Sequence, residues 1–202
     1  MKIKICGLSR EQDIEAVNEA RPDYIGFVFA EKSHRKVSPQ RAMMLRERLC
    51  PSIQAVGVFV NERVEVIYAL AESGTLDMIQ FHGNENERTI ERVKALTGKP
   101  VIVSVAVRSR DDILKRQGTC ADFLLLDNAS GGSGERFDWS LIGNVTKPFF
   151  LAGGLDIGNI HDAIATTRPF AVDVSSGVET NRLKDPEKIK AIVNAVKVAQ
   201  VF

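Results

Sequence analysis

The sequence predicts an α/β protein with a single-domain (β/α)8 TIM barrel, and three observations support this. Runs rich in Val, Ile and Phe alternate with helical patterns along the chain, eight such pairs occur, and no linker or low-complexity tract divides the 202 residues. Eight pairs fit a closed barrel or a doubly wound open sheet, and the count favours the barrel. Because about 250 residues is typical of this fold, the loops must be short.

The expected strands are rich in β-branched and aromatic residues and are bounded by Gly, Pro or polar residues. They are residues 3–6, 24–29, 54–60, 78–82, 101–107, 122–127, 148–154 and 170–176. The expected helices are residues 10–20, 38–49, 61–73, 84–98, 109–118, 137–145, 156–167 and 185–199. Ser38, Asn61 and Asp185 are expected helix starts, and Gly98 is an expected helix end.

Composition limits the class of protein. The chain has 27 basic and 26 acidic residues, a formal charge of +1, so we expect no nucleic-acid partner and no membrane surface. It opens on strand-like sequence without a signal peptide, and no apolar run is long enough to cross a bilayer. Three cysteines, Cys6, Cys50 and Cys120, have neither zinc spacing nor a disulfide pattern. A cytoplasmic, reducing location is therefore expected.

Strand alternation predicts which side chains face the barrel interior. Ile3 and Ile5 should pack outward against helices, which leaves Lys4 and Cys6 pointing inward. The first and last strands are neighbours once a barrel closes. Since a buried charge needs a partner, we expect Lys4 to pair with Asp173.

The last two strand ends predict an anion site. "AGGL" (152–155) contains Gly153 and Gly154, and "SSGVE" (175–179) contains Ser175, Ser176 and Gly177. Their backbone N–H groups can approach a phosphate closely, and the loops after strands seven and eight are the usual phosphate site of such barrels. Single glycines there can equally be turn residues, but two such loops favour phosphate binding.

Nine motifs carry a resemblance to a known family. They are "KICGL", "GFVF", "KSHRKVSP", "VGVFVN", "QFHGNE", "LLLD", "GGSGERFDW", "AGGL" and "RPFAVDVSSGVE", in order from residue 2 to about residue 190. The set resembles phosphoribosylanthranilate isomerase, a (β/α)8 enzyme of tryptophan biosynthesis. One departure lies in the fifth strand, where Ser104 of "VSVAV" stands where that family usually has a lysine.

The resemblance implies an Amadori rearrangement of N-(5-phosphoribosyl)anthranilate to the 1-deoxyribulose 5-phosphate aminoketose, with no metal and no cofactor. It implies Asp127 as general acid and Cys6 as general base. We expect burial to raise the pKa of Asp127, and helix N-termini with nearby cations to lower the pKa of Cys6. Arg35 is expected to hold the anthranilate carboxylate. His82 and Asp173 are expected substrate contacts.

Two further expectations concern the loop over the site and the assembly. The glycine-rich segment 128–139 is expected to cover the site as a mobile loop. The small-molecule substrate would be bound by a monomer or a homodimer.

Three alternative functions fit the sequence less well. A related synthase would use lysines at strand ends, and a sugar-phosphate epimerase would need several metal-ligand histidines, whereas His82 stands alone. A non-catalytic sugar-phosphate-binding paralogue would have lost the acid or the base, and this chain has both.

Overall fold

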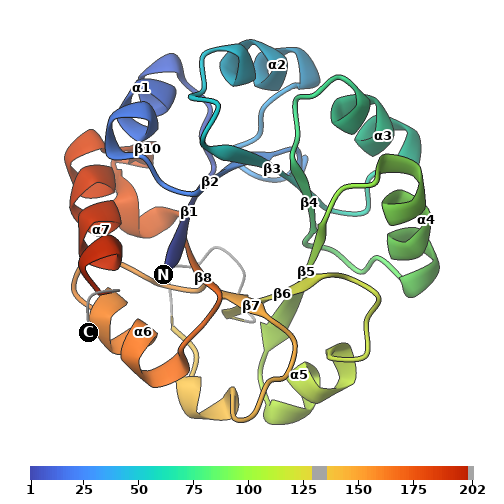
Figure 1. Ribbon diagram of the computed structural model, residues 1–202, viewed down its shortest axis with the longest axis vertical. Coiled ribbons are helices and arrows are strands. Elements are labelled where there is room, and N and C mark those ends of the chain that lie inside the picture. The colour runs from blue at the N-terminus through green and yellow to red at the C-terminus, as the bar shows by residue number, and fades with distance from the viewer. Residues whose placement is uncertain (129–135, 200–202) are drawn as a thin grey trace.

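The computed structural model describes residues 1–128 and 136–199, and in it eight parallel strands close into a barrel in chain order. The helices surround the barrel, and the N-terminus lies beside β8 where the ring closes (Figure 1). The strands are β1 (Lys2–Cys6), β2 (Tyr24–Val28), β3 (Gln54–Phe59), β4 (Met78–Phe81), β5 (Val101–Val107), β6 (Phe123–Asn128), β7 (Phe149–Leu151) and β8 (Ala171–Val174). The helices are α1 (Glu11–Ala20), α2 (Pro39–Glu47), α3 (Val64–Glu72), α4 (Glu87–Thr97), α5 (Arg110–Arg116), α6 (Ile160–Thr167) and α7 (Pro186–Val198).

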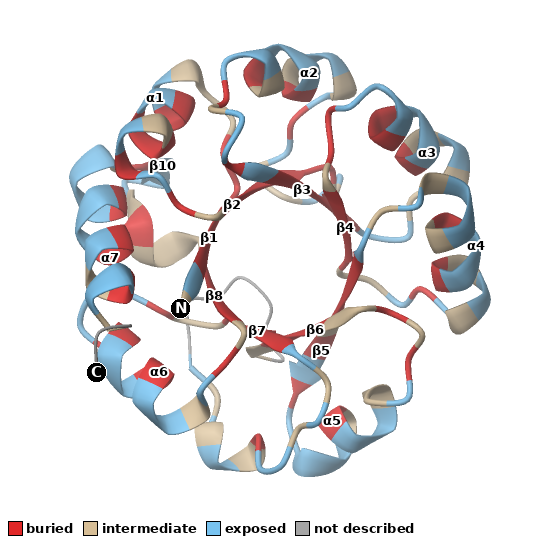
Figure 2. Ribbon diagram, in the orientation of Figure 1, coloured by how far each residue is buried: buried red, intermediate tan, exposed pale blue. Residues whose placement is uncertain are grey.

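The strand alternation predicted from sequence is confirmed. Ile3 and Ile5 belong to the large core between strands and helices, while Lys4 and Cys6 face inward. The barrel interior is filled by a separate apolar cluster built around the Phe150 ring, with Tyr24 packed edge-on against it. Figure 2 shows the strands almost entirely buried and the outer helix faces exposed. The apolar cluster therefore closes the barrel at the end where the strands begin, its lower end. Only the upper end, where the strands end, is open for chemistry.

Most of the helix boundaries follow the capping signals. The Ser38 side chain accepts from the N–H of Arg41, Asp185 caps α7 in the same way, and Gly98 ends α4 with φ 62°. The expected start at Asn61 is wrong: α3 begins at Val64. Asn61 has φ 51°, and its N–H donates to the buried Glu85 carboxylate, which holds this segment outside the helix.

The expected helix over 137–145 is also wrong. Only the short 3-10 helix η1 (Trp139–Leu141) forms there, and the chain turns at Gly143 with φ 54°. A further element appears after β8, where the 3-10 helix η2 (Ser176–Val178) leads into a small hairpin of β9 (Glu179–Thr180) and β10 (Leu183–Lys184). The expected cover loop 128–139 lies largely outside the described residues, which omit 129–135. Among the residues that the structure describes, no helix has the length and apolar character needed to cross a membrane.

The strands are joined in pairs at the lower end of the barrel by a repeated aspartate. An aspartate lies just before each of β2, β4 and β6, and its carboxylate accepts a hydrogen bond of 2.8–2.9 Å from a backbone N–H at the start of the preceding strand. The donors are Ile3 for Asp23, Ala55 for Asp77 and Val101 for Asp122. Each aspartate N–H donates back to the carbonyl of that same residue. At β7 and β8 only the backbone bond remains, from Phe170 to Phe149. The same pair of aspartate–backbone hydrogen bonds, here called the aspartate joint, therefore connects three pairs of neighbouring strands.

Asp77→Ala should destabilise the fold by about 1–3 kcal/mol, because the N–H of the fully buried Ala55 loses its acceptor. Asp77→Asn keeps an acceptor oxygen and should cost less. The measurement is urea unfolding of both variants, with exposed Asp162→Ala as the control. An Asp77→Ala protein as stable as the control variant would show that the aspartate joint adds nothing to the free energy of unfolding.

Candidate active site

A cavity of about 340 Å³ opens at the upper end of the barrel, where the strands end. Nine of the ten site residues predicted from sequence line it: Cys6, Arg35, His82, Asp127, Gly153, Gly154, Asp173, Ser175 and Ser176. Gly177 does not. A Cβ at Gly177 would lie 2.0 Å from the Leu155 carbonyl oxygen, so this glycine permits the loops after β7 and β8 to touch. A wider, open depression over η1 shares Gly154 with the cavity but is not lined by Cys6 or Asp127.

The predicted pair of Lys4 and Asp173 is confirmed. The two residues are register partners on β1 and β8, and Lys4 Nζ donates to Asp173 Oδ2 at 2.7 Å. Lys4 has no exposed surface. Burial works to lower the pKa of Lys4, but Asp173 outweighs it and the pKa is raised. The other oxygen, Asp173 Oδ1, is buried and has no partner among the described residues. Lys4 is therefore a charged ammonium buried inside the barrel.

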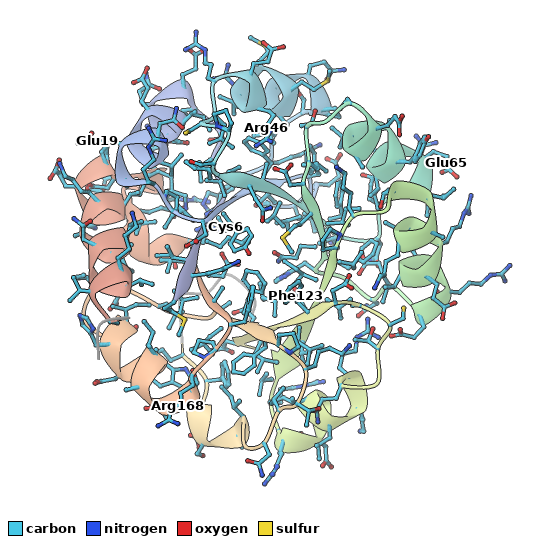
Figure 3. All side chains as sticks on the ribbon, in the orientation of Figure 1. Cys6, Glu19, Arg46, Glu65, Phe123 and Arg168 are labelled. Carbon is cyan, nitrogen blue, oxygen red and sulfur yellow. The ribbon has the colours of Figure 1, made fainter. Side chains whose placement is uncertain are left out.

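Cys6 lies one pleat above Lys4, and Figure 3 shows it at the inner wall of the barrel. Gly26 on β2 makes room for it, since a Cβ there would lie 2.7 Å from Cys6 Sγ. The expected lowering of the thiol pKa is wrong: burial raises the pKa of Cys6, and Lys4 and Lys184 oppose that only in part. Desolvation of a thiolate in a fully buried position outweighs the nearby cations. Without substrate, Cys6 is a thiol.

Asp127, near the end of β6, is confirmed as a carboxyl with a raised pKa. Burial raises its pKa, and the neighbouring His82 opposes this. Asp127 Oδ1 accepts from the N–H of Asn128 at 2.8 Å, and Oδ2 lies 3.8 Å from His82 Nε2. Ser104 of β5 holds the other ring nitrogen, with Ser104 Oγ 2.6 Å from His82 Nδ1. The site therefore holds a carboxyl with a raised pKa beside an oriented imidazole.

Arg35 is held from behind by residues that sequence reasoning missed. Its Nε and Nη2 donate to the two oxygens of Glu179 at 2.6 and 2.8 Å. Lys184 Nζ donates to the same carboxylate at 2.6 Å and to the Ser175 carbonyl at 2.9 Å. Gly7 makes this approach possible, because a Cβ there would lie 2.4 Å from Arg35 Cδ. One edge of the guanidinium is thus occupied, and only the outer edge remains for a ligand.

The charges of this network also shift the pKa values of Glu179 and Lys184. Burial works to raise the pKa of Glu179, but the hydrogen bonds from Arg35 and Lys184 outweigh it and hold the pKa at about 2. Burial lowers the pKa of Lys184, which Glu179 only partly offsets. With Arg35 and Lys184 both positive and Glu179 negative, the cluster carries one excess positive charge at the cavity wall. That excess favours an anionic group of a ligand.

The loops after β7 and β8 form another part of the cavity rim. Gly153 and Gly154 have φ 87° and 62°, a conformation that favours glycine. Within the described residues their backbone N–H groups find no acceptor. Ser175 Oγ donates to the Cys6 carbonyl at 3.0 Å, which fixes the second loop against β1. In the described ranges, 1–128 and 136–199, no group of three or more metal-ligating side chains could hold a metal ion.

A closed (β/α)8 barrel whose cavity holds a carboxyl and a thiol together with glycine-rich loops after β7 and β8 is typical of the class of sugar-phosphate-binding barrel enzymes. The comparisons with known proteins are more specific. A family model described as N-(5'-phosphoribosyl)anthranilate (PRA) isomerase matches residues 3–195. The chain belongs to this family.

Similar proteins agree over almost the whole chain. An N-(5'-phosphoribosyl)anthranilate isomerase from Endomicrobium trichonymphae is 47% identical over 200 residues, which are 97% of this chain and 98% of that protein. The phosphoribosyl anthranilate isomerase structure from Thermus thermophilus is 31% identical, with TM-score 0.89 over 98% of this chain and 99% of that one. Another structure, in complex with reduced 1-(o-carboxyphenylamino)-1-deoxyribulose 5-phosphate, is 35% identical, with TM-score 0.86 and the same coverage.

Lys4→Met should destabilise the protein by about 3–5 kcal/mol, because it leaves the Asp173 carboxylate buried without its partner. The double variant Lys4→Met/Asp173→Leu should recover most of that loss, since it removes both charges. Urea unfolding of the two variants checks this. Equal stability of Lys4→Met and the wild type would refute the role of the pair.

Glu179→Gln should reduce stability only where the carboxylate is charged. The folded pKa of about 2 lies below the ordinary value of 4.5, so this stabilisation is complete above pH 4.5 and is lost as the pH falls toward 2. The wild type should therefore lose its advantage over Glu179→Gln across that range. Urea midpoints of both proteins at several pH values measure this, and a pH-independent difference would contradict it.

Proposed function

We propose that this cavity catalyses the Amadori rearrangement of N-(5-phosphoribosyl)anthranilate, an isomerisation in tryptophan biosynthesis that proceeds by general acid–base catalysis. The observation that carries the proposal is the common cavity: Cys6 and Asp127 both line it, together with Arg35 and the glycine loops. A substrate with a carboxylate at one end and a phosphate at the other matches these two cationic and N–H-rich ends.

Asp127 is the proposed general acid. The reaction begins when the furanose ring opens, and the ring oxygen then needs a proton. Burial raises the pKa of Asp127, which favours the protonated form that can donate. Loss of that proton leaves a carboxylate opposite the iminium that ring opening creates, and the two charges stabilise each other.

Cys6 is the proposed general base. It has to remove the C2 proton of the iminium, which requires the thiolate, although burial keeps the thiol protonated without substrate. The positive charge of the bound iminium favours ionisation of a neighbouring thiol. Lys4 and Lys184 act in the same direction. We therefore infer that the base is activated by its own substrate rather than in the empty site.

The remaining predicted residues hold the substrate in this proposal. The outer edge of Arg35 receives the anthranilate carboxylate, and the loops with Gly153, Gly154 and Ser176 receive the phosphate. Gly177 acts indirectly by allowing its loop to meet Leu155. His82 and Asp173 line the same cavity and are the proposed contacts of the sugar portion.

We further propose that residues 1–202 form one catalytic domain acting on a small molecule as a monomer or homodimer in the cytoplasm. The eight strands close into one barrel, which supports a single domain. The three cysteines are free thiols, which supports a reducing compartment.

The experiment is turnover of freshly made phosphoribosylanthranilate, followed by fluorescence. Cys6→Ser and Asp127→Asn should each lower kcat by about 100- to 10,000-fold, the usual contribution of a general acid or base. Affinity for the reduced product analogue should stay within a few-fold, because the cavity persists. Cys50→Ser, a change in a partly exposed cysteine that does not line the cavity, is the control. A near-normal kcat in Cys6→Ser would remove Cys6 from the mechanism, and a loss confined to KM in Asp127→Asn would make that residue a binding group only.

A further inference from the structure

Ser104 occupies a position from which it contacts the acid–base machinery without lining the cavity. It lies in β5, between β4, which leads to His82, and β6, which carries Asp127, and these three strands are neighbours in the barrel (Figure 1). Ser104 and Leu125 are register partners, so Ser104 lies one layer below Asp127. Its hydroxyl is 2.6 Å from His82 Nδ1, a short hydrogen bond for an oxygen–nitrogen pair.

The surroundings of Nδ1 indicate which nitrogen of His82 carries the proton. The amide Nε2 of Gln80, a donor, faces Nδ1 at 3.4 Å. The Ser104 hydroxyl is able to donate as well as accept, and in the arrangement in which it donates, Nδ1 accepts from both sides. In a neutral imidazole the other nitrogen then bears the hydrogen. In that arrangement, Nε2–H is the atom of His82 that faces Asp127.

This tautomer matters because of the way Asp127 is held. Asp127 Oδ1 accepts the N–H of Asn128, so the proton of the neutral carboxyl belongs on Oδ2. Oδ2 is the oxygen 3.8 Å from His82 Nε2. An Nε2 that already carries hydrogen cannot accept the acid proton. The opposite tautomer would present a lone pair to Oδ2 and could take that proton, which would leave a carboxylate and an imidazolium.

We propose that Ser104 is a positioning residue that fixes the Nε2–H tautomer of His82 and so keeps the transferable proton on Asp127. The inference rests on the proposed role of Asp127 as the acid. Ser104 itself needs no contact with substrate. The other charged groups that face Asp127 are Asp173 of β8 and Lys4 of β1, which are paired with each other. His82 is therefore the neighbour whose protonation a single hydroxyl can redirect.

Nitrogen NMR of the imidazole rings tests the tautomer without any turnover. The chain has three histidines, His34, His82 and His161, so a His82→Gln spectrum assigns the His82 signals directly. The wild type at neutral pH should show His82 as Nε2–H with Nδ1 unprotonated. In Ser104→Ala, the imidazolium or the Nδ1–H form should increase about three- to tenfold, the range that loss of one hydrogen bond sets. Ser104→Thr keeps the hydroxyl and should restore the wild-type pattern.

Kinetics supply the second measurement. Ser104→Ala should lower kcat about three- to tenfold with little change in KM, because binding is intact and only the share of enzyme with its proton on Asp127 falls. Ser104→Thr should again recover most of the activity. The matched control is Ser52→Ala, an exposed serine that precedes β3 at the opposite end of the barrel.

The outcomes separate this inference from the proposed function. An Nδ1–H tautomer in the wild type, or identical His82 signals in the wild type and Ser104→Ala, would overturn the role of Ser104 while leaving Cys6 and Asp127 untouched. A change of tautomer without any change in kcat would also overturn it. Absence of turnover in the wild type would instead defeat the proposed function, and the NMR result would still report whether Ser104 controls His82.

Discussion

The buried pair of Lys4 and Asp173 is the constraint on which the site depends. It joins the first and last strands, so it lies at the seam where the barrel closes. A one-residue slip of β1 would turn Lys4 toward the helices and leave Asp173 buried without a partner, at a cost of several kcal/mol. The same slip would remove Cys6 from the cavity. One ion pair therefore fixes both the closing register and the direction of the thiol.

Burial acts on the two proposed catalytic groups in the same direction. It raises the pKa of Asp127 and the pKa of Cys6, because each ionised form loses hydration in the cavity. For an acid this is what the chemistry requires. For a base it is a hindrance, which nearby Lys4 and Lys184 reduce without removing. In the proposed mechanism these shifts favour ring opening, the step that has to come first, and the second step depends on a charge that the first step generates.

Sequence reasoning was strongest where a regular period decides the structure. Strand alternation predicted the inward direction of Lys4 and Cys6 and, with barrel closure, the contact of Lys4 with Asp173 across 169 positions. It failed where a contact depends on irregular backbone. Glu179 and Lys184 come together through a hairpin of two-residue strands that no apolar pattern predicts. Asn61 has the sequence pattern of a helix cap, and its hydrogen bond to Glu85 cannot be predicted from the sequence. The pKa of Cys6 was misjudged because nearby cations can be expected from a sequence, whereas complete desolvation is a property of the folded packing.

The hairpin after β8 gives those missed residues a common role. Lys184 joins the Ser175 carbonyl to the Glu179 carboxylate, and Glu179 in turn holds two nitrogens of Arg35. The loop after β8 is thereby connected to the Arg35 guanidinium through groups that are almost fully buried. Moving Arg35 would separate charges in a poorly hydrated region, which costs far more than rotating an exposed side chain. The position of Arg35 relative to the loop after β8 is therefore set by a charge network, whereas the barrel strands set the positions of Cys6 and Asp127.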